Sequence, residues 1–234
     1  MILAYLRRGL TAGLLAGLLA GLFAYLFAEP PLDRAIELEN AAHTEEHHEA
    51  VFSRGEQKVG LILATALYGT SIGALFGLLS AYFRRRIPTR SEWRRSMILA
   101  GAVFLGAVLL PFVKYPPNPP GVGADPATIT AHTLAYLAMV ALSLLAVLAA
   151  WRFSRGLEGA SFLVRGLTSA GILVGLWAFL YLAMPDFGGT SEHAPEDLIW
   201  HFRLSALGTQ AVLWAGIGCA FGLLGERANR RGAL

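Results

Sequence analysis

Six long apolar stretches constrain the fold of this chain more than any other feature of its sequence. A helix rises about 1.5 Å per residue, so about 20 apolar residues cross the roughly 30 Å hydrocarbon core of a bilayer. The stretches lie at about 9–28, 59–83, 96–113, 129–150, 162–184 and 201–224. Because none of them alternates apolar and polar residues with a period of two, transmembrane strands are excluded. We predict an all-α integral membrane protein whose single domain, 1–234, is a bundle of six transmembrane helices.

The composition agrees with a lipid environment. Hydrophobic residues make up 55% of the 234, charged residues make up 15%, and the mean hydropathy is +0.53. In a soluble domain about 25% of the residues are charged. This chain therefore has too little polar surface to cover a globule in water. Its one cysteine, Cys219, excludes an internal disulfide.

The charges alternate between the segments that connect the spans. If the N-terminus is cytoplasmic, 14 of the 19 basic residues lie on the cytoplasmic side and 13 of the 16 acidic residues lie outside. Because Lys and Arg concentrate in short cytoplasmic loops, we predict that both termini are cytoplasmic. The basic residues form no single patch, so we expect no nucleic acid partner. A signal peptide cleaved near Ala28 is the alternative reading of the first stretch, which is longer than the usual apolar part of such a peptide.

Glycines recur every four residues on the first two spans. They are Gly9, Gly13, Gly17 and Gly21 on the first and Gly69, Gly73 and Gly77 on the second. Small residues at this spacing let two membrane helices approach closely, so we expect these stripes to pack helices together. A homo-oligomer formed through the striped helices, or a seam along which helices slide, is the alternative.

All six histidines fall in the half of the chain predicted to face outside, and three lie in the acidic first outer loop, 29–58. If the loop is helical there, Glu39, His43 and His47 share one face, with Glu46 beside His43 and with His48 next in the chain. Imidazole and carboxylate together suit cobalt, nickel or zinc better than magnesium or calcium. We predict a capture site for a divalent metal ion, and a solvated acidic loop without metal is the alternative.

Further polar groups gather where the spans are expected to end on the outer side, and we call them the outer vestibule. They are Arg54, Gln57, Lys114, Tyr115, Asn118, Trp200, Arg203 and Gln210. Prolines at 116, 117, 119 and 120 prevent the third helix from continuing and leave backbone carbonyls unpaired. At membrane depth such backbone is buried in protein or lines a wet cavity. Because Lys114 and Arg203 are themselves cationic, we expect them to pair with Asp or Glu rather than contact a metal ion.

Two partial catalytic motifs fail on inspection. Gly69-Thr70-Ser71-Ile72-Gly73 has the spacing of a serine nucleophile elbow, but it lies within an apolar helix with no histidine at that depth. His48-Glu49 begins a zinc-protease pattern that ends at Phe52, where a second histidine would be required. No phosphate-binding loop motif is present. We therefore expect no enzyme activity and no tightly bound cofactor.

The most specific motif is the proline-rich segment 111–120, Pro-Phe-Val-Lys-Tyr-Pro-Pro-Asn-Pro-Pro. With Phe52-Ser53-Arg54 before the second span and Leu198-Ile199-Trp200-His201-Phe202-Arg203 at the start of the sixth, it resembles the CbtA family of cobalt transporter subunits. The resemblance covers nearly the whole chain.

This resemblance implies a function and a partner. It implies uptake of cobalt(II), or a similar divalent ion, for cobalamin synthesis across the plasma (inner) membrane of a bacterium or archaeon. It also implies that the chain works with a small one-span, histidine-bearing subunit similar to CbtB. A non-transporting scaffold or assembly subunit for a partner metal channel is the alternative.

Overall fold

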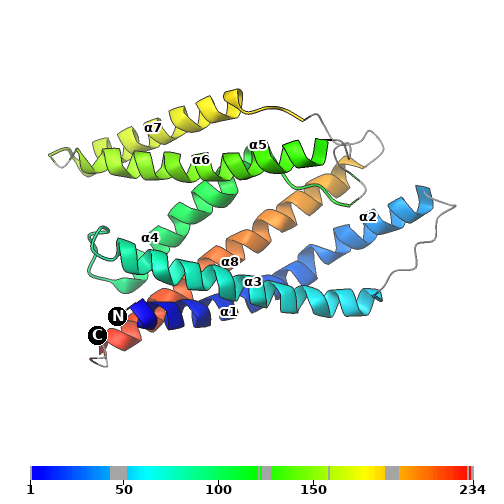
Figure 1. Ribbon diagram of the computed structural model, residues 1–234, viewed down its shortest axis with the longest axis horizontal. Helices are drawn as coiled ribbons and strands as arrows, with labels where there is room; N and C mark the ends of the chain where they lie inside the picture. The colour runs from blue at the N-terminus through cyan, green and yellow to red at the C-terminus, as the bar shows by residue number, and fades with distance from the viewer. Residues whose placement is uncertain are drawn as a thin grey trace. The chain divides into compact units, whose positions relative to one another are not determined.

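The computed structural model describes residues 2–42, 52–120, 122, 128–157, 159–187, 195–230 and 232, and of residues 39, 41 and 42 only the backbone (Figure 1). These residues form helices and connecting segments, with no strand among them. The helices are α1 (Ile2–Phe27), α2 (Glu29–Ala42), α3 (Arg54–Phe83), α4 (Glu92–Phe104), the π-helix η1 (Leu105–Leu109), α5 (Leu110–Lys114), α6 (Ile129–Arg155), α7 (Phe162–Ala183) and α8 (Glu196–Arg230).

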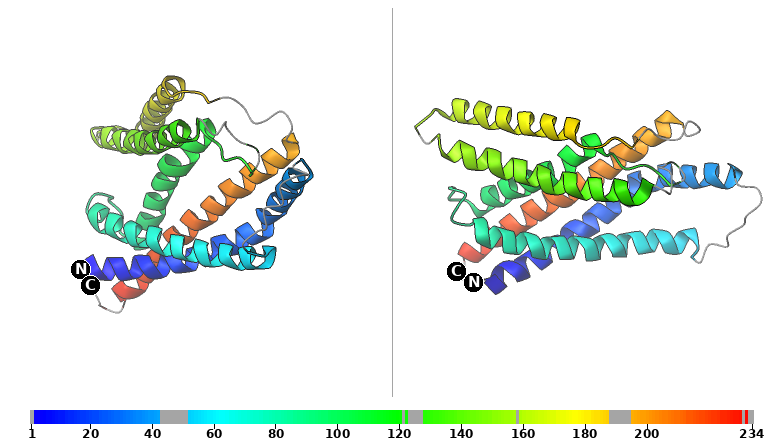
Figure 2. Two further views of the ribbon diagram at one scale, coloured as in Figure 1. Left: turned by 45° about the vertical axis from the view of Figure 1, so that its right-hand side comes forward. Right: turned by 45° about the horizontal axis from the view of Figure 1, so that its top comes forward.

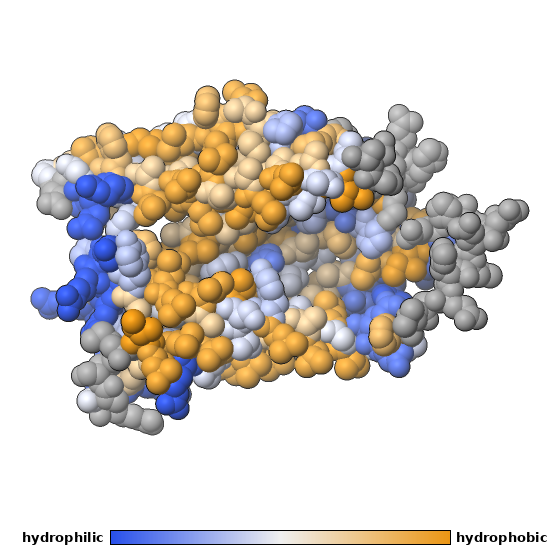
Figure 3. All heavy atoms as spheres, viewed as in Figure 1, coloured by the Kyte–Doolittle hydropathy of each residue, from blue (hydrophilic) through white to orange (hydrophobic). Residues whose placement is uncertain are grey.

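The six predicted spans are confirmed. Within the described ranges, six helical segments are long and apolar enough to cross a membrane. They are α1, α3, the continuous run Glu92–Lys114 formed by α4, η1 and α5, then α6, α7 and α8. Most of the face seen in Figure 3 is hydrophobic, and strongly hydrophilic residues gather towards the ends of the helices.

Four spans begin earlier than the apolar stretches indicate, at Ile2, Arg54, Glu92 and Glu196. In two of them, α3 and α8, polar residues beyond the apolar stretch start the helix. The first turn of α3 is closed by a capping box, in which the Ser53 backbone N–H donates to Glu56 Oε2 at 2.7 Å and the Ser53 hydroxyl accepts from the Glu56 N–H at 3.3 Å. The first turn of α8 contains Glu196 and Asp197, whose negative charges favour a helix N-terminus. Both helices therefore continue beyond the apolar stretch towards the side predicted to be outside.

The chain divides into two compact units. Unit 1 comprises Met1–Gly101, Pro119–Gly121 and Pro195–Leu234, and unit 2 comprises Ala102–Asn118 and Val122–Ala194. Unit 1 therefore contains α1, α2, α3, most of α4, and α8. Unit 2 contains the end of the third span together with α6 and α7.

In unit 1, α1 and α3 run in opposite directions and touch through their glycines (Figures 1 and 2). A Cβ atom placed on Gly13 would lie 2.1 Å from the carbonyl oxygen of Gly69, and one on Gly73 would lie 2.3 Å from the carbonyl oxygen of Gly9. Real Cβ atoms do not approach backbone this closely, so no other residue fits at these positions. The expectation that the stripes pack helices together is confirmed.

The other helices of unit 1 pack around this pair. The Ser96 hydroxyl of α4 donates to the Gly218 carbonyl of α8 at 2.7 Å. Aromatic rings from three helices meet near the end that carries the termini, with Phe221 lying 5.3 Å from Phe76 and 5.9 Å from Tyr5 between ring centroids. The core of unit 1 is therefore made of small residues along the helix seams and aromatic residues at this end.

Unit 2 contains a feature that the sequence analysis did not predict, a π-helical turn in the third span. The Leu110 N–H donates to the carbonyl of Leu105, five residues earlier. Pro111 follows directly, and a proline has no N–H and clashes with the carbonyl four residues before it. The wider turn accommodates this proline. The Trp177 indole N–H of α7 donates to the Leu110 carbonyl at 3.2 Å, which ties the interrupted span to its neighbour.

The contact between α1 and α3 can be tested with one methyl group. We expect Gly73→Ala to lower the free energy of unfolding by about 1–3 kcal/mol, because the methyl group meets backbone that cannot move aside cheaply. Thermal unfolding of the detergent-solubilised protein measures this loss. The control is Gly60→Ala on the same helix, where a Cβ has nothing within 4 Å. Equal melting temperatures for the two variants would contradict the close contact.

Candidate functional site

The candidate site lies at the end of unit 1 away from the termini. The N- and C-termini lie together at one end, whereas α2 and the first turns of α3 and α8 lie at the other (Figures 1 and 2). This second end carries the residues that the charge pattern predicts to be outside. The first half of the predicted outer loop is helix α2, which continues almost directly from α1. Pro30 and Pro31 fit because the first turn of a helix needs no N–H donors there.

The predicted metal-capture residues cannot be brought together from the described part of the chain. Glu39 lies on α2, but only its backbone is described, and His43, Glu46, His47 and His48 lie outside the described residues. Within the described ranges, no three His, Cys, Asp or Glu side chains converge in a way that could hold a metal ion. The capture site therefore stays a prediction.

An ion-pair network holds α2 against the start of α3. Arg54 contacts Glu29 through Nη2 at 2.8 Å and Asp33 through Nε at 2.9 Å. Lys58 Nζ lies 2.8 Å from the second oxygen of Asp33. Hydrogen bonds from Lys58 and then from Arg54 lower the pKa of the Asp33 carboxyl below its ordinary value. The network contains two acidic and two basic side chains, so its formal charge is zero without a metal ion.

Two predicted vestibule residues belong to this network. Arg54 Nη1 donates to Gln57 Oε1 at 2.6 Å, and Gln57 Nε2 donates to the backbone carbonyl of Phe52 at 3.0 Å. The structure therefore brings Arg54 and Gln57 together. Gln57 bonds the first turn of α3 to the segment before the helix, and Arg54 binds the acids of α2.

Three other vestibule residues, Lys114, Tyr115 and Asn118, belong to unit 2. Lys114 Nζ lies 3.6 Å from an oxygen of Asp186 and 4.7 Å from the centre of the Tyr181 ring. Only 7% of the Lys114 side chain is exposed, so an unpaired charge there would be costly. The expectation that Lys114 pairs with an acid is confirmed.

Tyr115 anchors the proline-rich segment to the rest of unit 2. Its side chain is buried, and its hydroxyl donates to the carbonyl of Pro185 at 2.6 Å. The ring lies 5.5 Å from His132 and 6.1 Å from Phe187, and those two rings stack on each other at 4.9 Å. The segment that follows the third span is thereby fixed against α6 and the end of α7.

The remaining vestibule residues lie on α8 in unit 1. Trp200 is exposed, whereas Arg203 and Gln210 are half-buried and sit two turns apart on one helix face. The predicted vestibule residues thus divide between the two units. The structure shows contacts within each group and does not test their common role.

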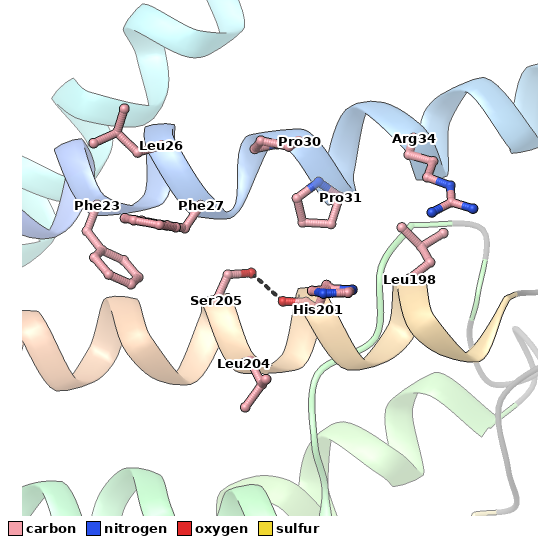
Figure 4. Close-up of a pocket in the computed structure, with 10 residues that line it drawn as sticks. All are labelled: Phe23, Leu26, Phe27, Pro30, Pro31, Arg34, Leu198, His201, Leu204 and Ser205. Carbon is pink, nitrogen blue, oxygen red and sulfur yellow. Dashed lines mark hydrogen bonds between the residues drawn. The ribbon is translucent and has the colours of Figure 1, made fainter.

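Sequence analysis missed a groove between α8 and the junction of α1 with α2 (Figure 4). Its volume is about 530 Å³, and its walls are mostly apolar. They include Phe23, Phe27, Pro31, Arg34, Leu198 and His201. Because the two walls come from segments that are far apart in the sequence, no local pattern could reveal the groove. One lining residue, His201, was noted in the sequence as a histidine predicted to face outside, but no function was assigned to it.

Polar contacts define the outer rim of this groove. Arg34 Nη1 on α2 lies 2.9 Å from Asp197 Oδ2 on α8, so an ion pair joins the two walls. His201 Nδ1 lies 2.7 Å from the backbone carbonyl oxygen of Asp197. The Ser205 hydroxyl donates back to the carbonyls of His201 and Phe202 within its own helix.

Comparison with known proteins gives one result. A family model described as "Probable cobalt transporter subunit (CbtA)" matches residues 2–226, almost the full length of the chain. No curated protein and no solved structure gives a significant match.

The ion-pair network between α2 and α3 predicts a specific dependence on pH. Because the pKa of Asp33 is lowered in the folded state, its contribution to stability is present above the unfolded pKa of about 3.9 and is lost as the pH falls through the lowered value. Asp33→Asn should cost about 1 kcal/mol at pH 7, a modest loss because about a third of the side chain is exposed to screening solvent.

Melting temperatures measured across pH check this expectation. The difference in melting temperature between wild type and Asp33→Asn should stay constant down to about pH 4 and decrease below that pH. Glu37→Gln is the control, because Glu37 is exposed on the same helix. A gap that persists at lower pH would contradict the assignment to Asp33.

Proposed function

Because the chain belongs to the CbtA family of probable cobalt transporter subunits, we propose that it is the membrane subunit of an importer that carries cobalt(II) for cobalamin synthesis. The observation that carries the proposal is the family match over residues 2–226 of a chain with six membrane-crossing helices. The family description names a component of a transporter, not an enzyme.

The polarity of the chain supports uptake from outside. Histidines and most acids lie in segments predicted to be external, and most arginines lie in segments predicted to be cytoplasmic. In this proposal Glu39, Glu46 and the histidines at 43, 47 and 48 collect the ion before it enters the helices. Imidazole and carboxylate ligands suit a borderline divalent ion such as cobalt(II), which supports cobalt as cargo.

The structure supports different roles for different vestibule residues. Arg54, Gln57 and Lys114 are engaged with neighbouring groups that hold α2 and the proline-rich segment in place. Pairing of cationic side chains with acids removes a charge that would repel an incoming cation. We propose that these residues support the outer end of their own unit, and that the predicted vestibule residues Asn118 and Gln210 act in transport.

A transporter component of this kind requires a partner, and the family description therefore implies one. We propose a small one-span, histidine-bearing protein similar to CbtB as this partner, in the plasma membrane of a bacterium or archaeon. A second histidine-bearing chain beside the outer loop would add imidazole ligands to those of the histidines at 43, 47 and 48.

Uptake of radioactive cobalt by cells tests the proposal. We expect His43→Ala combined with His47→Ala to reduce uptake at limiting cobalt by about tenfold, the lower end of what disturbing a metal site costs. The reduction should fade at high cobalt concentration, because an ion in excess no longer needs to be captured. Unchanged uptake at limiting cobalt would remove the capture site from the proposal.

Reconstitution separates transport from scaffolding. Liposomes that contain the purified chain with its partner should accumulate cobalt(II), and empty liposomes should not. If neither the chain alone nor the complex moves cobalt, while the partner alone does, then the chain is a scaffold for a partner channel.

A further inference from the structure

The groove between α8 and the junction of α1 with α2 has the properties of a binding site for an amphiphile. Its volume is about 530 Å³. Small-molecule sites measure roughly 300–1,000 Å³, and they are mostly apolar with a few polar groups that orient the ligand. Three apolar side chains of the groove, Leu26, Phe27 and Leu204, are about half-exposed. An apolar chain lying in the groove would cover them.

Apolar and polar residues are separated along the groove. Figure 4 shows Phe23 and Phe27 at one end, Arg34 at the other, and His201 between them. The apolar end belongs to the membrane-crossing helix α1, whereas Arg34 lies on α2, beyond the end of that span. A phospholipid in a bilayer has the same order, because its acyl chains lie in the hydrocarbon core and its headgroup lies at the surface. The groove therefore matches a lipid in both polarity and direction.

The start of α2 presents an apolar wall to the groove. The first N–H groups of a helix have no acceptor within that helix. Pro30 and Pro31 have no N–H, and both line the groove. An acyl chain can therefore lie against this turn without burying the two donors that other residues would place there, which would cost free energy.

The polar end of the groove carries both a cation and an anion. Arg34 Nη1 lies 2.9 Å from Asp197 Oδ2, and this bond uses one of several N–H donors of the guanidinium. Arginine binds phosphate well through such N–H groups, so Arg34 can bind a phosphate beside its carboxylate partner. The Asp197 carboxylate in turn can accept hydrogen bonds from an ammonium group. A headgroup that carries both charges would satisfy both side chains.

His201 adds a second acceptor at this end. Its Nδ1 lies 2.7 Å from the backbone carbonyl oxygen of Asp197, which can only accept, so Nδ1 carries the proton of this bond. In the neutral ring Nε2 is then an acceptor, on an exposed side chain that lines the groove. A primary ammonium group has N–H donors for such acceptors, whereas a quaternary ammonium group has none. The acceptors therefore favour a primary ammonium group.

We propose that this groove binds one membrane phospholipid whose headgroup contains a phosphate and a primary ammonium group, as in phosphatidylethanolamine. An acyl chain lies along Phe23 and Leu204. The phosphate accepts from Arg34, and the ammonium group donates to Asp197 and His201. The bound lipid joins α8 to the junction of α1 with α2 within unit 1. This inference is independent of the ion that the protein transports.

Native mass spectrometry of the purified protein in detergent tests the headgroup. The protein is mixed with palmitoyl-oleoyl phosphatidylethanolamine, or with phosphatidylcholine or phosphatidylglycerol bearing the same chains, and the fraction that retains one lipid is measured. Wild type should retain phosphatidylethanolamine about three- to tenfold better than phosphatidylcholine, the effect of an exposed hydrogen bond to a charged group. Equal retention of these two lipids, or stronger retention of phosphatidylglycerol, would overturn the proposal.

Asp197→Asn tests the contact with the ammonium group. The variant keeps an acceptor oxygen for Arg34 but removes the negative charge. The ratio of phosphatidylethanolamine to phosphatidylcholine retained should fall towards one, with retention of phosphatidylcholine unchanged. An unchanged ratio, or an equal loss of both lipids, would show that Asp197 does not select the headgroup and would contradict the proposal.

Leu204→Trp tests the position of the acyl chain. Leu204 lines the groove and is 46% exposed, so the larger indole can occupy the groove without entering the core. The control is Leu223→Trp on the same helix, where the leucine is 49% exposed and does not line the groove. We expect Leu204→Trp to lose most of the bound phosphatidylethanolamine and Leu223→Trp to retain it. Equal retention by the two variants is the result if the groove instead takes a membrane helix of another protein, and it would refute lipid binding here.

Discussion

The close backbone contact between α1 and α3 is the constraint on which unit 1 depends. Lipid is as apolar as the side chains of a membrane helix, so burial alone does not drive two helices together. Their association depends on how closely the backbones approach, and glycines on both helices provide that approach. Once α1 and α3 are fixed, α2 follows from α1 and the ion pairs to Arg54 and Lys58 fall within reach. The outer end is therefore positioned by contacts that lie within the membrane.

Charged groups in this protein are used chiefly to hold segments in place. Lys114 is buried beside Asp186, and Arg54 is shared between Glu29 and Asp33. A buried charge without its partner is strongly destabilising, so each such pair fixes the segment that carries it. The predicted vestibule residues Arg54, Gln57 and Lys114 are thus engaged in contacts that hold neighbouring segments in place. The residues that we propose to bind the metal ion are therefore the histidines and acids of the first outer loop.

The sequence was sufficient to predict the features that arise from local patterns. Apolar length predicted the six spans, and the four-residue repeat of glycine predicted close helix packing without identifying α1 and α3 as the two partners. The acid partner of Lys114 was predicted by type but not by identity, because Asp186 is distant in the chain. Three features were not predicted. Pro30 and Pro31 suggested a loop where α2 continues from α1, and Pro111 gave no indication of the π-helical turn before it. The groove was not predicted because its walls come from segments that are distant in the sequence. The missing information is long-range for the groove and for Asp186, whereas the two proline effects are local and ambiguous in sequence.

That turn has a consequence for how the third span tolerates insertions and deletions. A π-helical turn holds one residue more than an α-helical turn, so the span carries its extra residue at Leu105–Leu109. Removing one residue there would restore an α-helix and rotate everything after it by about 100° around the helix axis. Lys114 and Tyr115 would then turn away from Asp186 and Pro185. The contacts of the proline-rich motif therefore depend on the number of residues in the turn that precedes it.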